Sequence, residues 1–210
     1  MQPTPMTRPG QPTPTEVQFR VASEDDCVSL AVLADAASRR LMSWTWDAKA
    51  APGQSSFEVG REIIRSDTSS PSHRSSWIVA EYDGGLAGGL NSYRMPPAEQ
   101  AAAASSETAE VLRPLTDLKA AAEGTWYVAV ASVFPEFRGK GIGRAILGEA
   151  AKSASVDHAD KVTLLVASFN HDARRLYERL GFYEWQRRPF VPFQGSNEAG
   201  DWILMAQDLS

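Results

Sequence analysis

The sequence lacks most of the features that mark secreted, membrane or nucleic-acid-binding proteins. A single cysteine, Cys27, rules out an intramolecular disulfide. No apolar run approaches the ~20 residues of a membrane-spanning helix, and the polar N-terminus has no signal-peptide core. Lysines and arginines form no run, and the net charge of -5 argues against a nucleic-acid surface. We therefore expect a cytoplasmic protein that binds neither membrane nor nucleic acid, and we predict no metal site.

The composition is that of one globular domain with a tail. The 210 residues are 43% hydrophobic and 22% charged, enough for a sizeable core. Residues 1–14 hold five of the thirteen prolines and predict a flexible tail. We predict a single domain at 15–210, with an alanine-rich insertion at about 96–123. Pro97 predicts the start of one or two helices there, and Pro114 predicts a break.

Hydrophobic periodicity predicts an α/β fold: a single mixed, twisted β-sheet with helices on both faces. The predicted strands are Val17–Val21, Trp77–Tyr82, Leu86–Arg94, Trp126–Val133, Lys161–Ala167, Phe182–Gln186 and Trp202–Ala206. Outside the insertion, the predicted helices run from Ser23 to about Met42, over Phe57–Arg65, from the glycine-rich turn to about Val156, and over Asn170–Leu180, stopped by Gly181. Ser43–Ser56 is predicted to be a loop.

The stretch from Val128 to Leu147 reads as a buried strand, a glycine-rich turn and the start of a helix. Such a turn exposes backbone N–H groups at a helix N-terminus, an arrangement that binds phosphate. The spacing fits neither G-x-G-x-x-G nor G-x-x-x-x-G-K-[ST]. It does fit R-x-x-G-x-G, through Arg138, Gly141 and Gly143. The alternative is a turn without a ligand, but we favour a pyrophosphate site.

Two segments resemble the Gcn5-related N-acetyltransferase (GNAT) superfamily. Phe134-Pro-Glu-Phe-Arg-Gly-Lys-Gly-Ile-Gly143 is similar to its acetyl-CoA signature. The segment from Asn170 to Phe182 is similar to the family's N-x-x-A-x-x-L-Y-x-x-x-G-F pattern. The resemblance is strong over about 126–182, whereas over 17–94 it depends only on the order of elements. It implies a GNAT-like acyl-CoA N-acyltransferase fold.

The resemblance implies that acetyl-CoA, as co-substrate, binds where Tyr127–Val133 and Lys161–Ala167 splay apart. The pantetheine arm would pair with the backbone near Ser132 and Val133, as an added strand does, and Asn170 would cap its helix and contact the arm. The loop amides would hold the pyrophosphate, helped by the helix dipole. The predicted loop residues are Arg138, Gly139, Lys140, Gly141, Ile142, Gly143 and Arg144.

The resemblance makes Tyr177 the general acid that protonates the leaving thiolate, because a phenol keeps its proton at neutral pH. Tyr177 shares a helix face with Asn170, nearly two turns away. The alternative is a core tyrosine, since Ala173, Leu176 and Leu180 complete an ordinary apolar stripe with it.

The acceptor side of the predicted site is less defined. Glu81 and Glu123 are candidates for the base that deprotonates the acceptor ammonium, and a water chain is an alternative. Trp44 and Trp46 are candidate walls of the acceptor pocket, or they pack over the sheet edge. The sequence shows no carboxylate cluster, which would favour a polyamine or aminoglycoside as acceptor. It also shows no basic groove, which would favour an acidic acceptor.

These features predict an acetyl-CoA-dependent N-acetyltransferase. It would move the acetyl group to a primary amine of a small molecule or peptide by direct attack in a ternary complex. The alternative is a non-catalytic acyl-CoA-binding or sensing module. The oligomeric state is open, with a homodimer among the options.

Overall fold

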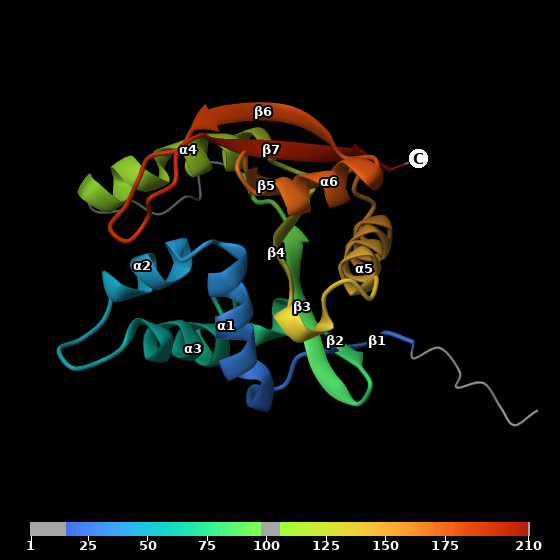
Figure 1. Cartoon of the computed structure of the whole chain (residues 1–210), viewed down its shortest axis with the longest axis horizontal. Coiled ribbons are helices and arrows are strands. Elements are labelled where there is room, and N and C mark those ends of the chain that lie inside the picture. The colour runs from blue at the N-terminus through green and yellow to red at the C-terminus, as the bar shows by residue number, and fades with distance from the viewer. Residues whose placement is uncertain (1–15, 98–105, 210) are drawn as a thin grey trace, which may run out of the picture.

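In the computed structural model, residues 16–97 and 106–209 are described, and within them the chain forms one seven-stranded sheet. The strand order is β1-β2-β3-β4-β5-β7-β6 (Figure 1). Neighbouring strands are antiparallel except β4 and β5, which are parallel. The strands are β1 Gln18–Val21, β2 Trp77–Tyr82, β3 Gly85–Arg94, β4 Trp126–Val133, β5 Lys161–Ala167, β6 Tyr183–Pro189 and β7 Asp201–Asp208.

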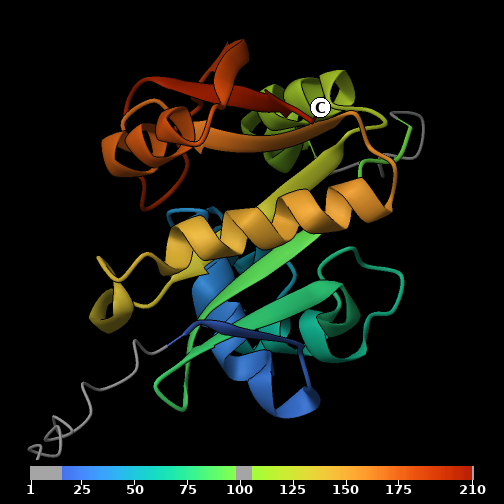
Figure 2. The ribbon, with the colours of Figure 1, turned by 90° about the vertical axis from the view of Figure 1, so that its right-hand side faces the viewer.

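Helices cover both faces of this sheet, as the sequence predicts. In Figure 1, α1 lies on one side of β3 and β4 and α5 lies on the other. Figure 2 shows α5 running across the sheet, while α4 packs on β6 and β7. The helices are α1 Cys27–Ala37, α2 Leu41–Asp47, α3 Ser56–Ser66, α4 Ser106–Ala121, α5 Ile142–Val156 and α6 His171–Arg179. Short 3-10 turns occupy Glu24–Asp26, Arg74–Ser76 and Pro135–Phe137.

The core is made where helix stripes meet the sheet. α5 buries Ile142, Ile146 and Ala150, which are spaced by four residues and therefore lie on one helix face. A second cluster fills the opposite side around Leu30 of α1 and Trp77 of β2. A third joins α4 to the C-terminal half of the sheet. The apolar periodicity of the sequence thus accounts for which helix face is buried.

The region after α1 differs from the prediction. The first helix ends at Ala37 instead of continuing to Met42, and Trp44 and Trp46 lie on α2 instead of in a loop. Arg39 and Arg40 have positive φ angles of 53° and 72°, which break the helix without a glycine or proline. The new helix is anchored by Asp35, whose Oδ1 accepts a hydrogen bond from the Ser43 backbone N–H at 2.8 Å.

The insertion also differs from the prediction. α4 continues through Pro114 as a single helix, so the predicted break is wrong. Proline removes one backbone hydrogen bond, and burial of Val111, Leu115 and Leu118 in the third cluster offsets that loss. Within the described residues α4 begins at Ser106, and the helix start predicted near Pro97 borders residues that the structure does not describe.

The segment 98–105, like the predicted tail at 1–14, lies outside the described residues. No helix within 16–97 and 106–209 is long and apolar enough to cross a membrane. The predicted cytoplasmic location stays a prediction.

Candidate active site

β4 and β5 pair over a short distance and then separate. Their register contains three pairs and ends at Val128 opposite Leu164. Beyond that point β4 continues to Val133 along β3, while β5 continues to Ala167 along β7. At the point of separation Ala129 is bulged out of the β3–β4 register, between Val128 and Val130. One edge of β4 is therefore left without a strand partner at the carboxyl ends of the two parallel strands, where α/β folds commonly bind ligands.

The glycine-rich loop follows directly from the unpaired end of β4. Gly139 and Gly141 have φ angles of 76° and 82°, and a Cβ at either position would meet nothing within 4 Å. The backbone amides of 139–144 donate no hydrogen bond to any described residue. They include the first amides of α5, which lack intrahelical acceptors. The loop thus presents a row of free donors at the positive end of a long helix.

Side chains hold this loop in place. The Arg138 Nε donates to the Val133 carbonyl oxygen at 3.3 Å, tying the loop to the end of β4. The Lys140 Nζ lies 5.1 Å from the Tyr82 ring centroid and 5.3 Å from that of Phe137, within cation–π range. A Cβ on Gly143 would lie 3.3 Å from the Leu176 Cδ2, so the small residue lets α6 approach α5 closely.

α6 carries the second predicted group of site residues. Asn170 is its N-cap, and its Oδ1 accepts a 3.4 Å hydrogen bond from the Ala173 N–H, which confirms the predicted cap. Tyr177 packs on the Phe182 ring with centroids 5.9 Å apart. Burial raises the pKa of Tyr177 to about 12, so its hydroxyl stays a neutral donor at physiological pH. These contacts describe the positions of Asn170 and Tyr177, and their roles stay predictions.

A cavity of about 660 Å³ opens beside the β4 bulge, and Ala129 and Val130 form part of its wall. Figure 1 shows elements that contribute to its lining: α2 lies below α4, and α1 lies between α2 and strands β3 and β4. Most of its lining surface is apolar. The remaining lining residues are Ala34, Ala37, Ser38, Leu41, Met42, Thr45, Ala48, Lys49, Pro71, Ser72, Asn91, Tyr93, Leu112, Leu115, Thr116, Lys119, Tyr127, Leu165 and Trp202.

Trp44 and Trp46 do not line this cavity, so the expectation that they wall it is not met. Trp46 is buried, and a Cβ on Gly60 would lie 2.5 Å from its Cε3. Trp44 packs on Phe193, with ring centroids 5.4 Å apart. A different face of this helical segment lines the cavity instead, through Leu41, Thr45 and Ala48.

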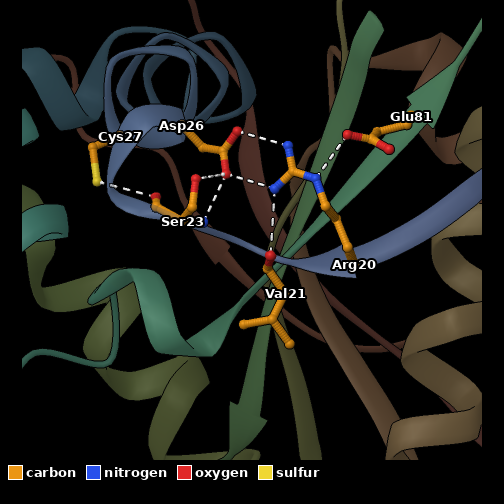
Figure 3. A network of polar contacts seen from close by, with 6 residues as sticks. All are labelled: Arg20, Val21, Ser23, Asp26, Cys27 and Glu81. Carbon is orange, nitrogen blue, oxygen red and sulfur yellow. Dashed lines mark hydrogen bonds and ion pairs between the residues drawn. The ribbon is translucent and has the colours of Figure 1, made fainter. Parts of the chain in front are cut away.

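Glu81 and Glu123 do not line the cavity either. Glu81 Oε1 accepts a 2.7 Å hydrogen bond from the Arg20 Nε on β1 (Figure 3). The same guanidinium donates to both carboxylate oxygens of Asp26, at 2.7 and 2.9 Å. Glu81 thus belongs to a structural ion-pair network at the β1–β2 edge. Glu123 is an exposed residue between α4 and β4.

This network predicts a pH-dependent loss of stability at low pH. Hydrogen bonding to Arg20 lowers the pKa of Asp26 to about 2, from 3.8. A depressed pKa contributes stability above the unfolded value, and the contribution is lost as pH falls from 3.8 towards 2. We expect Asp26→Asn to lower the free energy of unfolding by ~2 kcal/mol at pH 7, with the gap narrowing below pH ~4. Urea unfolding at several pH values measures this gap.

The adjacent Asp25 provides the matched control for that experiment, because its side chain is exposed. Asp25→Asn should leave the free energy of unfolding nearly unchanged at every pH. An Asp26→Asn gap of the same size at pH 7 and pH 3 would show that the Asp26 carboxylate charge is not what stabilises the fold.

Lys119, Tyr93 and Tyr127 are cavity residues that the sequence reasoning missed. Lys119 lies one turn after Leu115 and two turns after Val111, which are both buried. A lysine on the apolar stripe of an amphipathic helix is the signal that could have indicated it. The tyrosines lie on paired positions of β3 and β4 and give no such signal, because strand tyrosines are ordinary.

The fold and the site together define a class of protein. A sheet whose parallel pair splays beside a glycine-rich loop, with free amides at the next helix, is the architecture of acyl-CoA N-acyltransferases. The sequence profile of the Acetyltransferase (GNAT) family matches residues 38–182, more than half of the chain. The chain belongs to this family. It is therefore an N-acetyltransferase enzyme with acetyl-CoA as co-substrate, and not a non-catalytic binding module.

Solved structures agree with this fold. An N-acetyltransferase from Staphylococcus aureus Mu50 is 17% identical, covering 90% of this chain and 99% of its own, with a TM-score of 0.59. The structure of yncA from Salmonella typhimurium, with its cofactor acetyl-CoA, is 17% identical over 93% and 95%, with a TM-score of 0.58. The ribosomal-protein-alanine N-acetyltransferase from Brucella melitensis is 19% identical over 91% and 99%, with a TM-score of 0.58. At these identities the likeness shows the fold alone. No curated protein sequence matches the chain.

Proposed function

We propose that this enzyme transfers the acetyl group of acetyl-CoA to a primary amine of a small molecule or peptide, by direct attack within a ternary complex. The observation that carries the proposal is the position of the cavity. Its wall includes Ala129 and Val130, where β4 parts from β5. An acceptor in the cavity and a donor in the gap between the strands would therefore meet at the bulge.

The donor side is supported by the free backbone groups. The pantetheine arm would pair with the open edge of β4 near Ser132 and Val133, as an added strand pairs. The free amides of 139–144 would hold the pyrophosphate, with Lys140 and Arg144 adding positive charge. Asn170 caps α6 and has one amide group left to contact the arm.

The chemistry needs stabilisation of an oxyanion and a proton for the leaving sulfur. A backbone N–H of the bulged segment at Ala129 would stabilise the oxyanion, since the bulge removes it from the β3 register. Tyr177 would donate a proton or a hydrogen bond to the thiolate, because its raised pKa keeps it neutral. The described lining residues contain no carboxylate and no histidine. We therefore propose that the acceptor ammonium loses its proton through water.

Initial-rate kinetics test the direct attack. Thiol release is measured while acetyl-CoA and a reactive amine are both varied. A ternary complex predicts double-reciprocal lines that intersect. Parallel lines indicate a covalent acetyl-enzyme and would overturn the proposal. We expect intersecting lines, because the cysteine that could form an acetyl-enzyme, Cys27, is buried in the hydrophobic core and is not among the residues that line the cavity.

A further inference from the structure

Lys119 places an ammonium group in the cavity beside the β4 bulge. It projects from α4, is half-buried, and lines the cavity with Tyr127, whose ring centroid lies 5.7 Å from the Lys119 Nζ. Lys119 forms no hydrogen bond or ion pair with any described residue. The thirteen ion pairs within 16–97 and 106–209 involve other side chains. A cation in this setting lacks a counter-charge.

The other charged or titratable groups of the cavity do not supply one. Lys49, exposed on the α2 side, adds a second positive charge. Tyr93 and Tyr127 are neutral donors, since burial raises the pKa of Tyr93 to about 12 and also raises the pKa of Tyr127 well above its usual value. No aspartate or glutamate is among the described lining residues. The described cavity lining therefore carries a net positive charge. The sequence does not predict a basic groove, because Lys49 and Lys119 lie seventy residues apart.

Burial of an unpaired ammonium is costly, and the cost falls when an anion binds beside it. Desolvation lowers the pKa of Lys119, because burial disfavours the charged form of the amine relative to the neutral form. An acceptor that is only an amine enters as an ammonium ion and is repelled by both lysines. An acceptor that also carries an anionic group would offset Lys119 and bring its amine in at no net electrostatic penalty.

We propose that the acceptor is an amino-carboxylic acid with an apolar body, and that Lys119 binds its carboxylate while its amine lies at the Ala129 bulge. A carboxylate fits better than a phosphate group, because one half-buried lysine matches one negative charge. Leu112 and Leu115 from α4 and Leu165 from β5 supply the apolar walls. This inference rests on the proposed function, since it assigns the acceptor of the same site.

Turnover with matched amines tests the carboxylate preference. The probes are L-phenylalanine and L-methionine, with the methyl ester and the decarboxylated amine of each. We expect kcat/KM for the free acids to exceed that for the ester and the amine by ~10-fold or more, the factor that ~1.4 kcal/mol gives. Equal or better turnover of the esters and amines would overturn the inference while leaving N-acetyl transfer intact.

Product binding tests the anion site without turnover. The protein is saturated with CoA and titrated with N-acetyl-L-phenylalanine or N-acetyl-2-phenylethylamine in a calorimeter. We expect the acid to bind ~10-fold more tightly, and equal affinities would overturn the anion site. If the acid binds more tightly and yet no probe amine releases thiol, the proposed acetyl transfer to such amines fails while the anion site stands. An aminophosphonate analogue of phenylalanine binding more tightly than the amino acid would overturn the choice of carboxylate.

Variants assign the preference to Lys119. In Lys119→Met, which keeps the length and the packing, the ratio of acid to neutral probe should fall to ~1 through a raised KM for the acid. Lys119→Arg should restore part of it, because the charge returns. Lys152→Met removes an exposed α5 lysine and should leave the ratio unchanged. Thermal unfolding confirms that each variant is folded. An unchanged ratio in Lys119→Met, or a loss of kcat alone with the ratio intact, would overturn the assignment.

Discussion

Gly141→Glu should weaken acetyl-CoA binding by more than ~100-fold, the equivalent of ~2.7 kcal/mol. Gly141 precedes α5 with a φ of 82°, beside amides that have no acceptor among the described residues. A glutamate side chain would place a carboxylate against those amides and compete with the pyrophosphate for them. It would also strain the backbone by ~1–2 kcal/mol in the left-handed region. Calorimetric titration with acetyl-CoA measures the loss.

Gly148 offers a matched control on the same helix. It lies in α5 with no positive φ, and a Cβ there would meet nothing within 4 Å. Gly148→Glu adds the same charge two turns from the loop and should leave the affinity for acetyl-CoA nearly unchanged. Gly141→Asn, which tolerates the left-handed conformation, separates strain from charge. Wild-type affinity in Gly141→Glu would mean that the pyrophosphate lies elsewhere.

Tyr177→Phe should lower kcat by ~10²-fold or more, the usual contribution of a general acid, and should leave the affinity for acetyl-CoA unchanged. The substitution keeps the packing on Phe182 and removes only the hydroxyl. Steady-state kinetics and calorimetry together separate the two effects. Because the pKa of Tyr177 is raised to about 12, the wild-type kcat should show no alkaline loss from this group below pH ~10.

Tyr183 is the control for that variant, because it is an exposed tyrosine on the edge strand β6. Tyr183→Phe should leave kcat as it is. If Tyr177→Phe turns over at the wild-type rate, Tyr177 is a core tyrosine and the leaving thiolate obtains its proton from water. That reading was one of the two that the apolar stripe of α6 left open.

The parts of the fold that the sequence predicts best are those with strong local signals. β2 and β5 begin and end at the predicted residues, because an apolar run between polar turns marks both ends of a strand. α6 starts after the Asn170 cap and ends before Gly181, whose φ is 90°. The glycine-rich loop was predictable for the same reason: its residues are contiguous.

The acceptor side could not be predicted, because its residues come from distant segments. α2 follows two arginines with left-handed backbone conformations, and the presence of arginine in a sequence does not predict that conformation. The sequence does not show that Glu81 is paired, because its partner Arg20 lies on β1, sixty-one residues away. Pro114 predicts a helix break, whereas α4 continues through it with Leu115 and Leu118 buried. The cavity itself needs α2, α4 and the sheet together, and only tertiary packing sets their distances.

The short pairing of β4 with β5 has a consequence for the order of folding. β5 shares three register pairs with β4 and seven with β7, so most of its hydrogen bonds come from a strand that follows it by more than thirty residues. The chain between β5 and β7 must close into a loop before their pairing contributes any stability, and this entropic cost slows the formation of the pairing. Before β5, only the β2–β3 hairpin pairs strands that are close in the sequence, and β1–β2 and β3–β4 also pair across long connections. The β5 wall of the gap in which the donor would lie therefore depends on the docking of β7, and we expect a chain lacking β7 to lose that wall.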